Sequence, residues 1–339
     1  MSASCFLALE TSCDETAAAV CTEDGRILSS CIASQIEVHR ATGGVVPEVA
    51  SRNHILHVRL LAEQALKEAG VNLSDIRAFA ATSGPGLVSS LLIGTSMAKA
   101  LAVAGNKPFL AVNHMEGHLL SPFMGDHGPV RPCMALIVSG GHTMIVHVRS
   151  IADYKLIGRT RDDAAGEAFD KIGKMLGLPY PGGPEIDKKA REGDPTAIRF
   201  PRTMMADKNF EFSFSGLKTS VLYELPKLDF TQPNTLADVC ASVQEAIVDV
   251  LVEKLIAAAK KYKEQLVTVS GGVSCNRRLR ERLTERCEKE RLDLLLARPD
   301  HSTDNAAMIA FAAAQRFRLG ESSPLEQDVD PNMPLAAVE

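Results

Sequence analysis

The sequence predicts an α/β protein with two duplicated α/β lobes around a cleft. The main observation is the order of the expected elements, strand-strand-strand-helix-strand-helix-strand-helix, which occurs twice. The second is length, because 339 residues are more than one hydrophobic core usually organises. We expect a first lobe at 1–132 and a second at 133–304, with an insertion at about 177–232. A final helix, at about 305–325, is expected to rejoin the first lobe.

The first copy begins with three strands, and Asp24-Gly25 is typical of a hairpin turn between two of them. A helical spacing of apolar residues follows and ends at Gly70. A strand then breaks at Gly84-Pro85-Gly86. The expected elements are strands at 5–12, 16–22 and 26–34, a helix at 48–69, a strand at 76–82, a helix at 87–104, a strand at 109–112 and a helix from His114.

The second copy repeats this order, with glycine pairs at the ends of two strands. The last twenty residues carry no strong pattern, and we expect them to fray. The expected elements are strands at 134–139, 142–149 and 154–160, a helix at 166–176, a long helix at 235–262, a strand at 266–270, a helix at 276–289, a strand at 292–297 and a helix at 303–319.

Composition indicates an ordinary soluble globular protein, with 45% apolar and 23% charged residues. The net charge of −5 argues against a protein that coats nucleic acid alone, but it allows RNA contact through a local basic patch. We expect a cytoplasmic protein without a membrane span or secretory signal. The eight cysteines include no CxxC pair, which favours free thiols in a reducing compartment.

His114 and His118 are the first candidate site. Their spacing of four residues places both imidazoles on one face of a helix, close enough for one metal ion to bind both. The alternative is that one imidazole only caps or packs. The residues between them do not make HExxH, so the zincin peptidase template fails.

Two histidines need a third ligand. Asp304, between the last strand and the last helix, is the best candidate, and His301 is the runner-up. Glu116 should point away from the face that carries His114 and His118. Two histidines and a carboxylate suit iron(II), and also zinc or manganese.

Two similar Ser-Gly-Gly turns, at 139–141 and 270–272, are expected at matching places in the two lobes, where backbone N–H groups could hold phosphate oxygens. A tight turn is the alternative for each. Glu10 lies inside an apolar strand, where an unpaired charge is costly. We expect the polar stretch that it begins to meet nucleotide phosphates, through hydroxyls and backbone or through a cation.

Other charged residues have two interpretations. Asp170 and Asp187 lie near glycine-rich stretches and could bind ribose hydroxyls, or they could lie on solvated helix faces. One basic cluster, at 277–282, fits a solvated helix face. A second contains Arg199, Arg202, Lys208 and Lys218 and could touch an RNA backbone.

Taken together, these stretches resemble the TsaD family, also called Gcp or YgjD, over nearly the whole chain. The resemblance rests on residues 8–16 (ALETSCDET), 43–48 (GGVVPE), 84–87 (GPGL), 114–118 (HMEGH), 139–143 (SGGHT), 170–171 (DK), 181–184 (PGGP), 212–218 (FSFSGLK) and 270–276 (SGGVSCN).

The resemblance implies an actin-like ATPase (ASKHA, sugar kinase/Hsp70-type) fold. It also implies transfer of a threonylcarbamoyl group from threonylcarbamoyl-AMP to N6 of adenosine 37 in tRNAs that read codons beginning with A. The implied metal, usually iron, falls on His114, His118 and Asp304. The implied substrate-binding positions are Ile137, Val138, Ser139, Gly140, Gly141, Asp170, Gly183, Asp187 and Asn276.

At the first of these positions the family often has Leu, and Ile137 keeps a backbone contact intact. The resemblance further implies TsaB and TsaE as protein partners, with TsaC upstream to supply the adenylate. A role for bound ATP stays open. The alternatives are a sugar or acid kinase of the same fold, a metallopeptidase, and a nucleotide-switched binding module without enzymatic activity.

Overall fold

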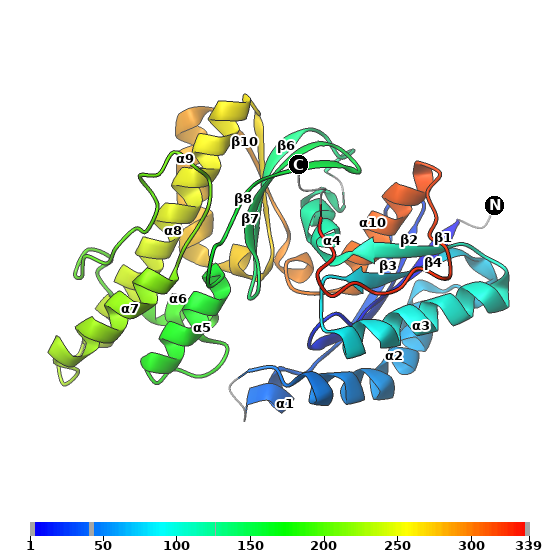
Figure 1. The fold of residues 1–339 in the computed structure, drawn as a ribbon, viewed down its shortest axis with the longest axis horizontal. Coiled ribbons are helices and arrows are strands. Elements are labelled where there is room, and N and C mark those ends of the chain that lie inside the picture. Colours follow the sequence, from blue (N-terminus) through cyan, green and yellow to red (C-terminus); the bar gives the residue numbers. More distant parts are fainter. Residues whose placement is uncertain (1–3, 41–43, 126, 336–339) are drawn as a thin grey trace. The chain divides into compact units, whose positions relative to one another are not determined.

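The computed structural model describes residues 4–40, 44–125 and 127–335, so Gly43 of the 43–48 motif (GGVVPE) lies outside the described residues. The chain divides into two compact units (Figure 1). Unit 1 comprises 1–130, 151–153 and 303–339, and unit 2 comprises 131–150 and 154–302.

Unit 1 contains a five-stranded sheet in the order β3-β2-β1-β4-β5. β1 pairs antiparallel with β2 and parallel with β4, so the sheet is mixed. Its strands are β1 (Cys5–Glu10), β2 (Glu15–Thr22), β3 (Ile27–Ser34), β4 (Ile76–Gly84) and β5 (Phe109–Asn113). β1 is buried along its whole length, which explains its continuous apolar sequence up to Glu10.

Helices pack on this sheet. α2 contacts β2 and β3, α3 contacts β4, and α10 contacts β1 and β2. α10 is buried from Ala306 to Gln315, and its six alanines allow close approach to the strands. The helices of unit 1 are α1 (Ile36–Arg40), α2 (Pro47–Ala69), α3 (Val88–Gly105), α4 (His114–Leu120) and α10 (Ala306–Arg318).

Unit 2 repeats the arrangement with a five-stranded sheet in the order β10-β9-β6-β7-β8. The pairing also repeats, because β6 is antiparallel to β7 and parallel to β9. The strands are β6 (Cys133–Val138), β7 (Thr143–Ser150), β8 (Asp153–Arg159), β9 (Leu266–Ser270) and β10 (Asp293–Leu296). The duplicated order predicted from the sequence is therefore confirmed.

The helices of unit 2 are α5 (Ala165–Met175), α6 (Gly182–Ala190), α7 (Ser215–Glu224), α8 (Thr235–Tyr262) and α9 (Arg277–Glu290). α6 and α7 lie in the stretch expected to be an insertion, and neither was predicted. α6 has only nine residues and begins in a stretch rich in Pro and Gly, and α7 buries only Leu217 and Val221, so neither gives a strong helical pattern. α8 is the centre of the unit 2 core and contacts both α6 and α9.

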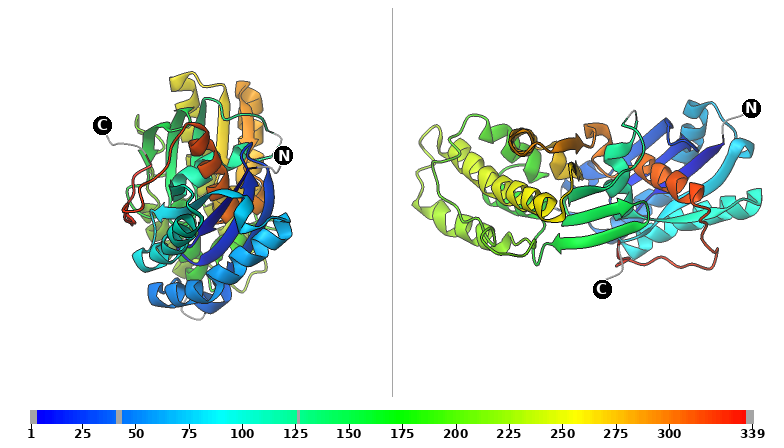
Figure 2. Two further views of the ribbon diagram at one scale, coloured as in Figure 1. Left: turned by 90° about the vertical axis from the view of Figure 1, so that its right-hand side faces the viewer. Right: turned by 90° about the horizontal axis from the view of Figure 1, so that it is seen from above.

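The C-terminal segment was expected to fray, and up to residue 335 this was wrong. Ser323 N donates to Phe109 O (2.8 Å) and Asp330 N donates to Ser83 O (2.9 Å). The segment, red in Figure 2, thus lies against β4 and β5 of unit 1. These hydrogen bonds are made by backbone atoms. The pattern of apolar side chains therefore could not predict them.

The last helix also starts later than expected. Asn305 is its N-cap, and its side chain accepts a hydrogen bond from Met308 N (2.9 Å), so Asp304 stays outside the helix. Of the described residues, α3 alone is long and apolar enough to cross a membrane by length and composition. In the structure α3 packs against β4 and α2.

Candidate functional site

Three side chains of unit 1 form a compact cluster, and they are those expected to hold a metal. His114 and His118 lie on α4, and Asp304 lies just before α10. One ligand atom from each lies within 4.8 Å of the other two. α4 starts where it does because Asn113 caps it, accepting hydrogen bonds from Met115 N and Glu116 N. The cap fixes where α4 begins, and therefore which side of the helix carries both imidazoles.

The two imidazoles share one oxygen of Asp304. Nε2 of His118 lies 3.0 Å from Oδ1 of Asp304, and Nε2 of His114 lies 3.4 Å from the same oxygen. The two rings are perpendicular, with centroids 4.8 Å apart. Nδ1 of His118 is buried and has no hydrogen-bond partner among the described residues.

Glu10 holds the first histidine from behind. Its carboxylate is fully buried and its Oε2 lies 3.0 Å from Nδ1 of His114. The same oxygen accepts a hydrogen bond from the Thr82 hydroxyl, and Oε1 accepts one from Ser12 N, both at 2.6 Å. Because Nδ1 is engaged by Glu10, Nε2 is directed toward Asp304. The charge that looked costly in an apolar strand is therefore fully paired.

The charges of this cluster stabilise one another. Burial opposes protonation of His114, but the carboxylates of Asp304 and Glu10 outweigh it and raise its pKa to about 10. Burial also acts to raise the pKa of both carboxyls, yet His114 lowers the pKa of Glu10 and holds that of Asp304 well below its usual range. The buried carboxylate of Glu10 and the partly exposed carboxylate of Asp304 thus remain ionised beside the two histidines, an environment that attracts a cation.

The donor set fits a divalent metal ion. Two donor atoms bound at about 2.1 Å to one ion lie roughly 3.0 Å apart in octahedral and roughly 3.4 Å apart in tetrahedral geometry. The separations of the two Nε2 atoms from Oδ1 of Asp304 are 3.0 and 3.4 Å, and no two of the three ligand atoms lie more than 4.8 Å apart. A carboxylate that orients a ligating histidine through its other ring nitrogen is a recurrent feature of metal sites, and Glu10 is in that position. This cluster could hold a metal.

Glu116 and His301 do not belong to the cluster. Glu116, expected to point away, accepts a hydrogen bond from Nε of Arg316 (2.8 Å). His301, the runner-up ligand, belongs to unit 2. The role of Glu10 as a partner of His114 was missed, because 104 residues separate the two in the chain. The sequence signal that could have suggested a partner for Glu10 was its charge inside an apolar strand.

In unit 2, both Ser-Gly-Gly turns lie at the carboxyl ends of neighbouring strands. β6 pairs parallel with β9, and Ile137 lies opposite Ser270. The expectation that the turns occupy matching places in two lobes was therefore wrong, since both belong to one sheet. Gly271 has φ +88°, and a Cβ there would lie 2.4 Å from Val138 O, so only glycine fits. Space is open at Gly140 and Gly141, where an added Cβ would meet nothing within 4 Å.

The remaining substrate-position candidates also lie in unit 2. Asp170 on α5 accepts hydrogen bonds from Gly182 N (2.7 Å) and Gly183 N (3.4 Å), which joins it to the start of α6. Burial raises the pKa of Asp170. Asp187 is mostly buried, with one oxygen 3.3 Å from Arg191 and the other without a hydrogen-bond partner among the described residues. Asn276 caps α9 and donates to Gln244 (2.7 Å).

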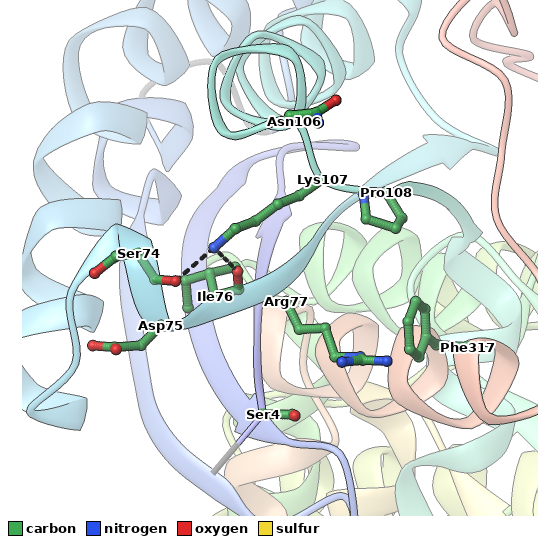
Figure 3. Close-up of a pocket in the computed structure, with 9 residues that line it drawn as sticks. All are labelled: Ser4, Ser74, Asp75, Ile76, Arg77, Asn106, Lys107, Pro108 and Phe317. Atoms are coloured by element: carbon green, nitrogen blue, oxygen red, sulfur yellow. Dashed lines mark hydrogen bonds between the residues drawn. The ribbon is translucent and has the colours of Figure 1, made fainter. Parts of the chain in front are cut away.

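A hollow of about 510 Å³ lies at the amino ends of β1 and β4 in unit 1 (Figure 3). It contains neither the candidate metal ligands nor the candidate substrate-binding residues. Its amine, Nζ of Lys107, donates to the backbone oxygens of Leu73, Ser74 and Ile76. Its guanidinium, from Arg77, lies over the ring of Phe317. The charged groups of Lys107 and Arg77 are thus already engaged by other residues of unit 1.

Comparison with known proteins supports the resemblance read from the sequence. The family model described as "TsaD: tRNA N6-adenosine threonylcarbamoyltransferase" matches residues 26–311. The chain belongs to the TsaD family. A TsaD relative named tRNA N6-adenosine threonylcarbamoyltransferase, from Anaeromyxobacter sp. (strain Fw109-5), is 50% identical over 96% of this chain and 98% of its own length. The one of that name from Kosmotoga olearia is 47% identical over 98% of this chain and 99% of its own.

Solved structures extend the likeness of this TsaD chain to its fold. HypF from T. kodakarensis matches with a TM-score of 0.64 at 12% identity, over 92% of this chain and 48% of HypF. Component A of the Acidaminococcus fermentans (R)-2-hydroxyglutaryl-CoA dehydratase matches with a TM-score of 0.55 at 13% identity, over 92% of this chain and 98% of its own. At these identities the likeness concerns the fold alone, and it is the actin-like ATPase fold with its two related α/β units.

Proposed function

We propose that this TsaD-family chain transfers the threonylcarbamoyl group of L-threonylcarbamoyladenylate to N6 of adenosine 37 in tRNAs that read ANN codons, releasing AMP. The observation that carries the proposal is membership of the family, with relatives of the same name aligned over almost the whole chain. Two features of the structure support it: the histidine-aspartate cluster could hold a metal ion, and the glycine turns leave space for a phosphate.

The adenylate is assigned to unit 2. Ile137 to Gly141 lead into a turn whose glycines leave room for phosphate oxygens beside the backbone. Asp187 has a buried oxygen without a hydrogen-bond partner among the described residues, which could accept a hydrogen bond from a ribose hydroxyl, and Asp170 holds Gly183 at the start of α6. Asn276 holds the start of α9. The same turns suit the phosphates of ATP, so nucleotide binding of either kind fits this fold.

The metal is assigned to His114, His118 and Asp304, with iron(II) favoured and zinc or manganese as alternatives. When bound, a divalent ion would supply Lewis-acid stabilisation of the negative charge that develops on a carbonyl oxygen. Glu10 keeps Nδ1 of His114 occupied, so that Nε2 would be the nitrogen available to the ion.

In the transfer, N6 of adenosine forms a bond to the carbamoyl carbon, and the bond from that carbon to the phosphate oxygen of AMP breaks. The N6 proton passes to solvent and AMP leaves as the anion. An exocyclic amine is a weak nucleophile, so positioning supplies much of the rate. Ser139 N donates to His142 O, so the backbone N–H groups of Gly140 and Gly141 are the ones that stabilise the leaving phosphate. No side chain is assigned as a covalent nucleophile.

Partners complete the proposal. A net charge of −5 is unfavourable for binding tRNA alone, so protein partners of the TsaB and TsaE kind are expected to help, with TsaC upstream to make the adenylate. This activity belongs to the cytoplasm, where tRNA is modified.

The test is a reconstituted reaction. Purified chain, threonylcarbamoyl-AMP and unmodified tRNA are incubated with and without the partner proteins, and the nucleosides are measured by mass spectrometry. We expect threonylcarbamoyladenosine from the wild-type chain and none from a His114→Ala, His118→Ala double variant. His127→Ala, an exposed histidine outside the cluster, is the matched control and should retain activity.

Three results would contradict the proposal. Absence of the modified nucleoside under all conditions would reject the transferase assignment. A phosphorylated small acceptor formed from radiolabelled ATP would favour a kinase. Unchanged modification by the double variant would remove the metal cluster from the mechanism.

A further inference from the structure

A recess rich in arginine lies in unit 2. It has a volume of about 1050 Å³ and is formed by residues 195–205 together with α7, α8 and α9. We call it the arginine recess, after Arg199, Arg202, Arg278 and Arg282, which line it together with Glu245 and Asp249. Four cationic and two anionic side chains leave an excess of two positive charges, in a chain whose net charge is −5.

Two of these guanidinium groups are held in place by carboxylates of α8. Arg278 donates to both oxygens of Glu245, at 2.6 and 2.8 Å. Arg202 donates from two nitrogens to one oxygen of Asp249, at 3.1 and 2.9 Å. Both arginines are mostly buried, with side chains 26% and 22% exposed. These cations are positioned before any ligand arrives.

Arg282 is also paired, with Glu285 at 3.3 Å, Asp249 at 3.4 Å and Glu245 at 3.8 Å, although its buried Nε has no hydrogen-bond partner within the described part of the chain. Arg199 differs from these three. It is exposed, and no hydrogen bond or ion pair is found for it among the described residues. Arg199 therefore offers donors to an anion from outside.

The shape and chemistry of the recess fit a nucleic-acid backbone. Guanidinium groups match phosphate oxygens in geometry and stay charged at any physiological pH. Met205, which is exposed, lines the same recess and gives apolar surface for a ribose or a base. A small inorganic anion would fill little of this volume, whereas an RNA strand brings several phosphates to it.

The recess is also connected to the proposed adenylate site. Glu245 follows Gln244 on α8, and the Gln244 side chain accepts the 2.7 Å hydrogen bond from Asn276. Arg278 comes two residues after Asn276 and lies in the first turn of α9. The same stretches of α8 and α9 therefore carry a candidate substrate contact and the cationic recess.

We propose that the arginine recess binds phosphodiester groups of the tRNA substrate, with Arg199 as the free cation and Arg202, Arg278 and Arg282 as positioned donors. This inference rests on the proposed function, because it takes tRNA as the polyanion. It assigns to the chain a binding surface of its own for RNA despite the anionic net charge.

The test measures binding of unmodified tRNA to the full-length chain by fluorescence anisotropy over a range of KCl concentrations. The variants are Arg199→Ala and Arg199→Glu, which remove no ion pair found in the structure, so folding should be unaffected; thermal melting checks this. Lys289→Ala is the matched control, since Lys289 is an exposed cation on α9 that does not line the recess. The partner proteins are added in a parallel series.

We expect Arg199→Ala to weaken binding about three- to tenfold near 0.1 M salt, with a slope of log K against log[KCl] smaller by about one. Arg199→Glu should weaken binding further, and Lys289→Ala should match the wild type. Equal affinity and slope for all variants would overturn the proposal, as would failure of the wild-type chain to bind tRNA at low salt with or without partners.

Two outcomes separate this proposal from the proposed function. Normal modification by the wild type with unchanged tRNA affinity in the Arg199 variants would reject the recess alone. No modification, but tRNA binding that depends on Arg199, would reject the function and keep the recess. Loss of binding to an acidic partner protein by Arg199→Glu, with tRNA affinity unchanged, would make the recess a protein-docking surface and overturn the RNA assignment.

Discussion

At the scale of single residues, the candidate metal centre depends on a carboxylate that does not itself belong to the ligand set. Glu10 is fully buried, bonded to Ser12 and Thr82, and 3.0 Å from Nδ1 of His114. An unpaired charge at that position would be costly, and the pairing with His114 removes the cost. Glu10 thus fixes which nitrogen of His114 faces Asp304.

Replacing Glu10 by Gln should therefore weaken metal binding. The amide keeps the size of the side chain but loses the charge and one acceptor, and loss of such a partner typically costs about 10- to 100-fold in metal affinity. Isothermal titration with zinc, or with iron(II) under anaerobic conditions, measures the effect. Glu63→Gln, on the exposed face of α2, is the control. Equal affinities would show that Glu10 does not orient His114.

Glu15 has an unusual titration. Burial raises its pKa from 4.5 to about 8, with Asp14 adding to the rise and the Ser34 hydroxyl opposing it. Between these two pH values the folded chain keeps a proton that the unfolded chain has lost. The contribution of this group to stability is therefore complete below the lower value and is lost as pH rises toward the higher one.

Glu15→Gln should remove this pH dependence. We expect the melting temperatures of variant and wild type to be similar near pH 4.5 and the variant to become the more stable of the two as pH approaches 8. Differential scanning calorimetry across this range checks it. Melting curves that shift in parallel for both proteins would show that Glu15 titrates normally.

At the scale of elements, the C-terminal segment supports the helix that carries both histidines. The side chain of Asn113, the N-cap of α4, donates to Met333 O (3.3 Å) and Pro334 O (3.2 Å) while it accepts from the first turn of the helix. Gly84 is also covered, since a Cβ there would lie 1.9 Å from Asp330 O. The segment therefore restrains both the cap of α4 and the end of β4.

Deleting residues 324–339 should loosen α4. The deletion removes the hydrogen bonds that Asn113 donates to Met333 O and Pro334 O, each worth about 0.5–1.5 kcal/mol, and we expect a lower melting temperature together with weaker zinc binding. Circular dichroism and calorimetric titration measure the two effects. A shorter deletion of 336–339, outside the described residues, is the control. A truncated chain with unchanged zinc affinity would contradict the supporting role.

At the scale of the whole molecule, the two units separate the two kinds of chemistry. The candidate metal ligands all belong to unit 1, and the candidate adenylate residues all belong to unit 2. A ligand that binds only the folded state stabilises the unit that holds it.

Zinc alone should therefore protect unit 1 from hydrogen exchange and leave unit 2 unchanged. At 100 times the dissociation constant the added stability is about 2.7 kcal/mol, or roughly 100-fold slower exchange of amides that open by global unfolding of the unit. Exchange followed by mass spectrometry of peptides resolves the two units. His118→Ala should abolish the protection. Protection spread equally over both units would contradict a site confined to unit 1.

Local sequence patterns predicted much of the fold and part of the candidate site. The strand and helix periods predicted the duplicated order because they reflect burial along each element, and the spacing of His114 and His118 predicted a shared helix face. Short helices such as α6 and α7, and a segment held by backbone hydrogen bonds such as the C-terminal one, show no clear periodic pattern of apolar residues, so the sequence did not predict them.

Contacts across the chain needed the folded structure. Glu10 and His114 are 104 residues apart, and Asp304 is 186 residues from His118, so no local pattern relates them. Both Ser-Gly-Gly turns lie at the carboxyl ends of neighbouring strands because β6 and β9 pair in parallel, although 128 residues of chain lie between them. Sequence patterns report which faces are buried, whereas the partner that covers each face is selected by packing and pairing of the complete fold.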